Sequence, residues 1–113
     1  MAKNKLAYIE LPATRTDEMK TFYGALFGWS FQDWGSDYTS FSESGLEGGF
    51  NAADEHRTRA PLAIIETDDI GTMEERVRQT GGKITLPTFK FPGGRRFHFT
   101  DPSGNELAVM QVE

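Results

Sequence analysis

Residues 6–29 read LAYIELPATRTDEMKTFYGALFGW, and this stretch joins a strand signal directly to a helix signal. Its beginning, LAYIEL at 6–11, suits a short strand that ends at Pro12, because proline has no N–H to donate to a sheet. Apolar residues then recur at the spacing of one helix face, at Met19, Phe22, Tyr23, Leu26 and Phe27. Gly28 suits the left-handed residue that ends a helix. The stretch therefore predicts a strand followed by an amphipathic helix.

Three strand-like segments follow this helix, and the same order of elements returns in the second half of the chain. The first half is expected to continue with strands at 29–34, 38–43 and 46–51. The second half gives a strand at 61–67, a helix between Asp69 and Gly81, and strands at 83–89, 95–100 and 106–112. The spacing from Tyr8 to Leu62 equals the spacing from Gly28 to Gly82. A repeat of this length predicts two similar β-α-β-β-β modules.

The repeat also gives an expected domain organisation and fold class. We expect a single domain over residues 1–113, with module one at about 1–53, a polar linker at about 54–60 and module two at about 61–113. Each module is a small sheet with a helix on one face, which is an α+β arrangement. Two curved mixed sheets side by side would leave a groove, and a concave surface between modules is the expected ligand site.

Composition and charge exclude several classes of protein. The chain has no cysteine, which excludes disulfides, thiolate nucleophiles and cysteine-ligated zinc. It has 12 Lys and Arg residues against 17 Asp and Glu, and this negative net charge argues against nucleic acid as a partner. No apolar run approaches the roughly 20 residues that span a bilayer, and the first residues do not resemble a signal peptide. We therefore expect a soluble, cytoplasmic protein with no membrane partner.

Several motifs together resemble those of the vicinal oxygen chelate (VOC) superfamily, which includes glyoxalase I, extradiol dioxygenases and bleomycin-resistance proteins. The motifs are YIELP at 8–12, FYGALFGW at 22–29, TDDI at 67–70, GGKI at 81–84 and DPSGNEL at 101–107. They cover the whole chain, and the greatest similarity is to small, uncharacterised glyoxalase-related proteins. The resemblance implies the two-module fold described above, a small-molecule ligand and a homodimer.

The resemblance also implies where a metal site would lie. Metal enzymes of the superfamily carry four ligands, one on the first and one on the last strand of each module, and the metal acts as a Lewis acid on vicinal substrate oxygens. The matching positions here are Tyr8, Leu62, Ala108 and either Gly48 or Gly49. Leu, Ala and Gly offer no side-chain donor to a metal. We therefore expect no metal cofactor at these positions and no glyoxalase I activity, although the fold is shared.

Strand alternation predicts which other side chains would line the groove. If Tyr8 faces it, then Glu10 does too, because successive side chains of a strand point to opposite faces. The same reasoning and the resemblance give the expected ligand-binding residues, which are Tyr8, Arg96, Glu106, Trp34, Leu62, Ala108 and Met110. Arg96 could pair with an anionic ligand or be a solvated residue near the start of its strand.

His98 is the candidate for acid–base chemistry. It lies between two phenylalanines in a predicted strand, and a histidine beside a carboxylate can act as a general base near neutral pH. Glu10 and Glu106 are the candidate partners, so the expected catalytic residues are His98 and Glu10. Two alternatives stay open: His98 is simply solvated or hydrogen-bonded on a polar sheet face, or His98, Glu10 and Glu106 form a displaced divalent-metal site.

Three functions are compatible with these residues. The first is a protein that binds a small organic molecule in the groove without a metal ion and without turnover. The second is an enzyme, of lyase, isomerase or dioxygenase type, that uses His98 with a glutamate or a displaced metal. The third is an interaction domain whose groove serves a dimer interface. The sequence favours binding slightly over catalysis.

Overall fold

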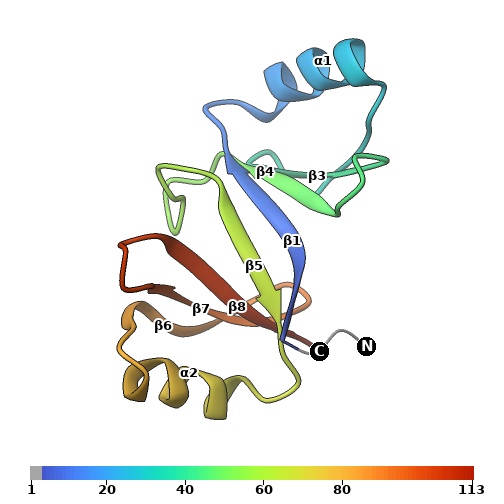
Figure 1. Ribbon diagram of the computed structural model, residues 1–113. Coiled ribbons are helices and arrows are strands. Elements are labelled where there is room, and N and C mark those ends of the chain that lie inside the picture. The colour runs from blue at the N-terminus through green and yellow to red at the C-terminus, as the bar shows by residue number, and fades with distance from the viewer. Residues whose placement is uncertain (1–3) are drawn as a thin grey trace. The chain divides into compact units, whose positions relative to one another are not determined.

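The computed structural model describes residues 4–113, and its elements follow the order β-α-β-β-β twice (Figure 1). Eight strands and two helices give the α+β class that the sequence predicts. The chain forms two compact units: one consists of residues 8–62, and the other of residues 63–113 with the beginning of the first strand, 4–7. No helix in the described part of the chain is long and apolar enough to cross a membrane.

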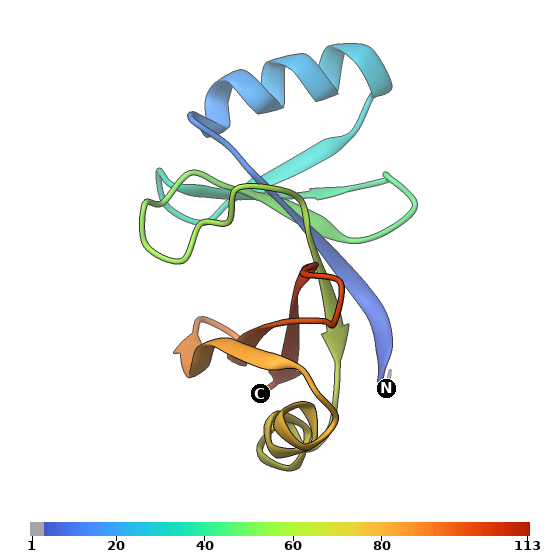
Figure 2. The ribbon, with the colours of Figure 1, turned by 60° about the vertical axis from the view of Figure 1, so that its left-hand side comes forward.

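The unit of residues 8–62 is a four-stranded mixed sheet with one helix. Its elements are β1 (Lys5–Pro12), α1 (Thr16–Phe27), β2 (Ser30–Asp33), β3 (Tyr38–Ser42) and β4 (Gly48–Asn51). The strand order is β2-β3-β4-β1, in which β1 and β4 are parallel and the other pairs antiparallel. The helix lies across one face of this sheet, as Figure 2 shows. The opposite face of the sheet is therefore not covered by α1.

The core of this unit is mainly aromatic and lies between α1 and the sheet. Phe41 and Phe50 are buried at its centre. The rings of Tyr23 and Trp29 stack with their centroids 5.1 Å apart. Gly28 ends α1 in the left-handed conformation, with φ 75°, and donates its N–H to the carbonyl of Gly24, as the sequence predicts. These contacts fix the helix over one face of the sheet.

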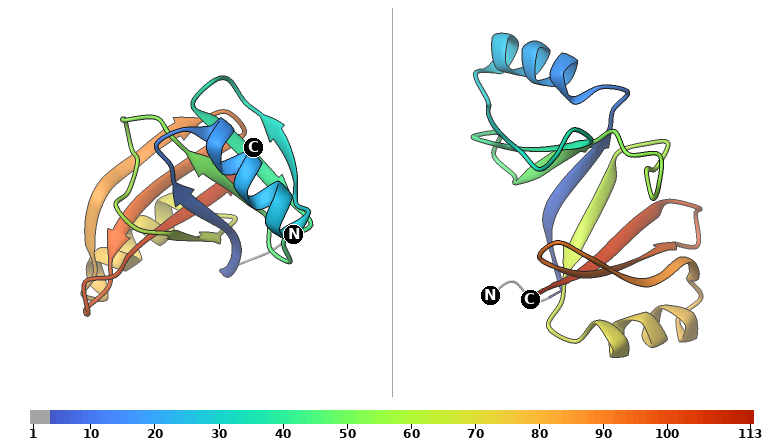
Figure 3. Two further views of the ribbon diagram at one scale, coloured as in Figure 1. Left: turned by 90° about the horizontal axis from the view of Figure 1, so that it is seen from above. Right: turned by 180° about the vertical axis from the view of Figure 1, so that it is seen from behind.

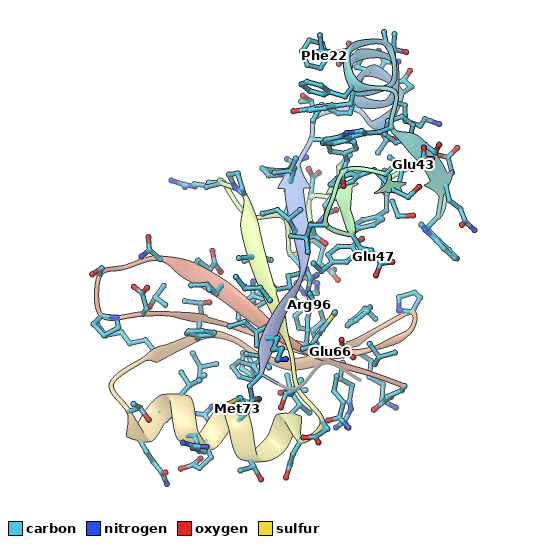
Figure 4. All side chains as sticks on the ribbon, turned by 45° about the vertical axis from the view of Figure 1, so that its right-hand side comes forward. Phe22, Glu43, Glu47, Glu66, Met73 and Arg96 are labelled. Carbon is cyan, nitrogen blue, oxygen red and sulfur yellow. The ribbon has the colours of Figure 1, made fainter. Side chains whose placement is uncertain are left out.

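The apolar residues of α1 do not all face this core. Met19 and Tyr23 pack against the buried cluster. Phe22, Leu26 and Phe27 are 57%, 58% and 58% exposed, and Phe22 points away from the strands in Figure 4. The helical spacing therefore correctly predicts a helix, but only part of the apolar stripe is covered within the unit.

The second unit repeats the arrangement. Its elements are β5 (Leu62–Glu66), α2 (Ile70–Gln79), β6 (Lys83–Phe91), β7 (Gly94–Thr100) and β8 (Glu106–Val112). The strand order is β5-β8-β7-β6, with β5 and β8 parallel and the other pairs antiparallel. Helix α2 runs along this sheet (Figure 3). β6 continues to Phe91, two residues further than expected, and Gly94 already belongs to β7, so the turn between them consists of Pro92 and Gly93.

Side chains of the second unit alternate between the two faces of its sheet. Phe97 and Val109 are buried on the α2 side, where Met73 packs against them. Arg96 and His98, the neighbours of Phe97 on β7, therefore lie on the opposite face of the sheet. Figure 4 shows Met73 and Arg96 on the two sides of the sheet. The strand alternation expected for this part of the sequence is present in the structure.

Asp69 caps the N-terminus of α2, and this cap gives a pH-dependent prediction. The carboxylate accepts hydrogen bonds from the hydroxyl of Thr72 at 2.8 Å and from its N–H at 3.2 Å, and these bonds lower the pKa of Asp69. Because the pKa of Asp69 is lower in the folded chain than in the unfolded chain, its carboxylate stabilises the fold at pH values above the pKa of the unfolded chain. This contribution is lost as the pH falls through the pKa of the folded chain. Asp69→Ala should therefore lower the thermal unfolding midpoint at pH 7.

The same measurement at acidic pH checks the cause of this effect. The difference between Asp69→Ala and the wild type should shrink as the pH is lowered toward about 2, because the wild-type carboxyl becomes protonated as the pH falls through its lowered pKa. Glu75→Ala, at an exposed position of the same helix, is the control and should change the midpoint little at either pH. An Asp69→Ala effect of equal size at both pH values would contradict the role of the charge.

Candidate functional site

The sheet face of the 8–62 unit opposite α1 carries a hydrogen-bonded group of polar side chains, here called the tyrosine–glutamate cluster: Tyr8, Glu10, Tyr38 and Asn51. The hydroxyl of Tyr38 donates to Oε2 of Glu10 at 3.0 Å and lies 2.7 Å from the hydroxyl of Tyr8. The amide of Asn51 donates to Oε1 of Glu10 at 3.4 Å. Both carboxylate oxygens of Glu10 therefore receive a hydrogen bond within this cluster.

The register of the sheet explains how three strands bring these residues together. On β1 Glu10 lies beside Gly49 of β4, and Gly49 lies beside Ser40 of β3. Tyr38 therefore reaches Glu10 across β4, and its ring lies over Gly49. A Cβ at position 49 would be closer than 3.0 Å to the ring and the hydroxyl of Tyr38. The absence of a side chain at Gly49 is thus what lets Tyr38 join the cluster.

Burial determines the protonation of Tyr38. Glu10 is only 3% exposed, and Tyr38 lies against it. Burial raises the pKa of the Tyr38 hydroxyl far above its ordinary value, and the negative charge of Glu10 raises it further. Tyr38 therefore keeps its proton at any physiological pH and acts as a hydrogen-bond donor to Glu10.

The second unit carries a different polar pair, His98 and Glu106. Nδ1 of His98 lies 3.2 Å from Oε2 of Glu106, and the hydroxyl of Thr85 donates to the same carboxylate oxygen at 3.1 Å. His98 is completely buried on β7, with its ring 5.9 Å from that of Phe89. The structure thus brings His98 together with Glu106, one of its candidate partners, within this unit.

Arg96 lies on the same face of β7 as His98. Its guanidinium carbon is 5.5 Å from the ring centroid of Phe89 and 5.8 Å from that of Phe91. These distances are typical of cation–π contacts. The side chain is 8% exposed. Arg96 is therefore a buried cation held beside two aromatic rings, and not a solvated residue near the start of its strand.

The remaining expected ligand-binding residues differ in exposure. Leu62 and Ala108 are completely buried, and Ala108 lies beside His98 in the register of β7 and β8. Met110 is partly buried and lies beside Arg96 in the same pairing. Trp34 is 59% exposed at the end of β2, and its indole N–H donates to the hydroxyl of Ser40 at 3.0 Å. Trp34 makes none of the hydrogen bonds described for the tyrosine–glutamate cluster.

Tyr38 and Asn51 are site residues that the sequence did not predict. One signal for Tyr38 was available: it belongs to a strand in which Thr39 and Phe41 are buried, so Tyr38 and Ser40 fall on the other face. Gly49 of β4 lies on the same face and has no side chain that would displace Tyr38. Asn51 had no comparable signal, because its contact with Glu10 joins residues far apart in the sequence.

Strand β4 is closely packed at Gly48 and Gly49, the two positions that the resemblance matches to one metal ligand. A Cβ at Gly48 would be closer than 3.0 Å to the carbonyl oxygen of Ile9 and to the ring of Phe41, and Gly49 is covered by Tyr38. Strand β4 therefore has no room for a ligating side chain at either position. Among residues 4–113 no group of three or more His, Asp or Glu side chains lies close enough together to hold a metal ion.

Comparison with solved structures gives the same fold. The Mn(II)-bound glyoxalase from Novosphingobium aromaticivorans matches 97% of this chain and 39% of its own with a TM-score of 0.68 and 18% sequence identity. Methylmalonyl-CoA epimerase from Mycobacterium tuberculosis matches 96% of this chain and 88% of its own with a TM-score of 0.73 and 13% identity. At these identities the similarity shows the fold alone.

Sequence comparison identifies the family. A protein named "Putative glyoxylase CFP32" from Mycobacterium tuberculosis is 27% identical over 116 residues, which cover 93% of this chain and 44% of the relative. The chain thus spans less than half the length of the curated relatives that it matches. The model of the Glyoxalase/Bleomycin resistance protein/Dioxygenase superfamily matches residues 5–109. The resemblance noted in the sequence is confirmed, and the chain belongs to this superfamily.

Proposed function

We propose that this chain binds a small organic molecule through its own side chains, without a metal ion at the positions used by the related metal enzymes. The observation that carries the proposal is the packing around β4. Gly48 and Gly49 have no room for a side chain, and the ring of Tyr38 lies where a ligand side chain from position 49 would begin. A fold that serves metal enzymes thus carries hydrogen-bonding groups here in place of a ligand set.

The tyrosine–glutamate cluster supplies groups that suit ligand recognition. Small-molecule sites combine apolar walls with a few polar groups that are held in fixed positions. Tyr8 is partly buried and is held by its bond to Tyr38, so its hydroxyl has a defined place on the sheet face. Contacts from Arg96, Glu106, Trp34, Leu62, Ala108 and Met110 stay predictions. So does the expectation that one groove between the modules holds the ligand.

Metal content is the first measurement. Untagged protein, purified without chelator and then offered Ni, Zn, Co, Mn and Fe in turn, is expected to retain less than about a tenth of an equivalent of each. The reason is that three of the four matching positions hold Leu62, Ala108 and either Gly48 or Gly49, which offer no side-chain donor, and Tyr8 is a single ligand. Near one equivalent of any metal, measured by elemental analysis, would contradict the proposal.

An enzyme that uses His98 is the second candidate. The observation in its favour is the His98–Glu106 contact at 3.2 Å, because a carboxylate that orients a histidine is a common arrangement for a general base. One related fold belongs to a methylmalonyl-CoA epimerase, so proton abstraction next to a thioester carbonyl is the reaction to test. No metal is required in this test.

The test follows exchange of the methylmalonyl-CoA C2 proton for deuterium. If the wild type catalyses exchange, His98→Gln and Glu106→Gln are expected to slow it by about tenfold or more, since general base catalysis contributes roughly 10²–10⁴-fold. His56→Gln is the control, because His56 lies in the loop before β5, and it should leave the rate unchanged. If mass spectrometry detects no exchange with the wild type, this second candidate function is contradicted.

We also propose that the chain forms a homodimer in the cytoplasm, as the sequence and the resemblance imply. Phe22, Leu26 and Phe27 provide exposed apolar surface on α1. Clustered exposed apolar residues are typical of protein–protein contacts. The partner and the location both stay predictions.

A further inference from the structure

We infer that a pocket beside the end of β1 binds the oxyanion group of a small organic molecule, a carboxylate or a phosphate, through Arg59. The pocket has a volume of about 450 Å³, which lies within the range of small-molecule sites. It is lined by residues 12–14, at and after the end of β1, and by Asp54, Arg57, Thr58 and Arg59 of the loop before β5; it is here called the loop pocket. No residue of the tyrosine–glutamate cluster lines it, so this site goes beyond the proposed function.

Arg57 holds the loop side of the pocket in place. Its Nη1 donates to the carbonyl of Ala13 at 3.0 Å and to the carbonyl of Ala52 at 3.2 Å. Its Nη2 donates to Oδ1 of Asp54 at 3.2 Å. Ala13 follows β1 and Ala52 follows β4, so this one side chain ties the loop to the ends of two strands. The loop therefore has a defined shape before a ligand binds, which reduces the entropy lost on binding.

Two hydrogen-bond donors of the loop pocket are available to a ligand. Arg59 and Thr14 are exposed, and within residues 4–113 the side chain of neither makes a hydrogen bond or an ion pair. The hydroxyl of Thr58, in contrast, donates to the carbonyl of Ala60 at 2.7 Å, within the loop. A guanidinium presents several N–H groups in one plane, and this geometry matches two oxygens of a carboxylate or a phosphate. Arg59 is therefore the residue that we expect to contact the anion, with Thr14 as a further donor.

The charge of the lining favours an anion, although the whole chain has a net charge of −5. Two arginines, Arg57 and Arg59, line the loop pocket against one carboxylate, Asp54. The Asp54 side chain is 98% exposed and is paired with Arg57, so water and that pairing weaken its repulsion of a bound anion. Pro12 and Ala13 add apolar surface to the same lining, which suits the carbon part of an organic anion.

The first part of the test compares three probes: benzoate, phenyl phosphate and benzamide, the neutral counterpart of benzoate. Each is titrated into ¹⁵N-labelled protein, and the backbone amide signals of Thr14, Thr58 and Arg59 are followed by NMR. At least one anion should shift these signals and bind about fivefold more tightly than benzamide, the upper end of what an exposed ion pair contributes. Which anion binds more tightly identifies the group as a carboxylate or a phosphate. No shift with either anion, or equal affinity for benzamide, would overturn the inference.

The second part uses charge variants with the tighter-binding anion. Arg59→Gln should weaken binding about fivefold, because it removes the charged donor. Arg76→Gln, at an exposed position of α2 outside the loop pocket, makes the same change of net charge and should leave the affinity unchanged. Asp54→Asn should strengthen binding about twofold, because it removes a carboxylate from the lining, and partial unfolding cannot produce tighter binding. Equal affinities of Arg59→Gln and Arg76→Gln would overturn the inference, since net charge alone would then account for the binding.

Discussion

Gly48→Ala is expected to destabilise the fold by roughly 3 kcal/mol, near the upper end of what overpacking usually costs. The added Cβ would be closer than 3.0 Å to two groups, the carbonyl oxygen of Ile9 and the ring of Phe41. The carbonyl belongs to the backbone of β1, which is parallel to β4 and cannot move without breaking the sheet. Chemical denaturation with an unchanged m-value measures the loss.

Gly49→Ala provides a comparison at the neighbouring position. Its Cβ would meet the side chain of Tyr38, which can rotate, so we expect a loss of about 1–2 kcal/mol. In a Tyr38→Ala background the loss caused by Gly49→Ala should be smaller, because the colliding ring is gone. Gly71→Ala is the matched control: its Cβ would meet nothing within 4 Å, and alanine favours the helix that contains it.

These variants also test the argument against a metal ligand on β4. If Gly48→Ala and Gly49→Ala are both as stable as Gly71→Ala, then β4 has room for side chains. A histidine or glutamate at either position would then be sterically possible, and the packing argument for a metal-free site would fail. The expected order of stability is Gly71→Ala, then Gly49→Ala, then Gly48→Ala.

The sequence predicts the elements of this fold well because their signals are local. Helical spacing gives α1, Gly28 ends it, and the strand alternation around His98 correctly separates Phe97 from Arg96. The predicted boundaries differ mainly at turns, as at Gly94. A Cβ there would collide with the carbonyl oxygen of Gln111, so Gly94 serves strand packing and not the turn. Such a contact across strands leaves no local mark in the sequence.

The candidate site is less predictable because it depends on pairings between distant segments. Within its own unit Glu10 is bound by Tyr38 and Asn51, and neither of these residues was expected from the sequence. Those contacts require β1 to pair with β4 in parallel and β3 to follow in register. Periodicity shows which face a residue occupies, but not which residue of another strand lies beside it.

Dependence on distant segments also explains why the apolar stripe of α1 is only partly covered. The spacing of its apolar residues predicts one continuous stripe, yet only Met19 and Tyr23 reach the core of the unit. How much of a stripe is covered depends on the strands beneath the helix, and β2 and β4 each have only four residues. The exposed Phe22 shows that an apolar position in a sequence pattern is not always a buried position in the unit.

Glu10→Ala is expected to destabilise the fold by about 2–4 kcal/mol. Glu10 is 3% exposed, and its removal leaves the hydroxyl of Tyr38 and the amide of Asn51 buried without this acceptor. An unsatisfied buried donor costs about 1–3 kcal/mol. Glu47→Ala is the control: the side chain is exposed, so the change should stay within about 0.5 kcal/mol. Urea denaturation of the two variants gives the comparison.

A double-mutant cycle then separates the Glu10–Tyr38 hydrogen bond from other effects of removing a carboxylate. Tyr38→Phe in the wild type loses the donor, but in Glu10→Ala the hydroxyl has already lost its charged acceptor. Tyr38→Phe should therefore cost less stability in Glu10→Ala than in the wild type, with a coupling energy of about 1–2 kcal/mol. Additive losses would mean that the Tyr38–Glu10 bond contributes nothing to stability.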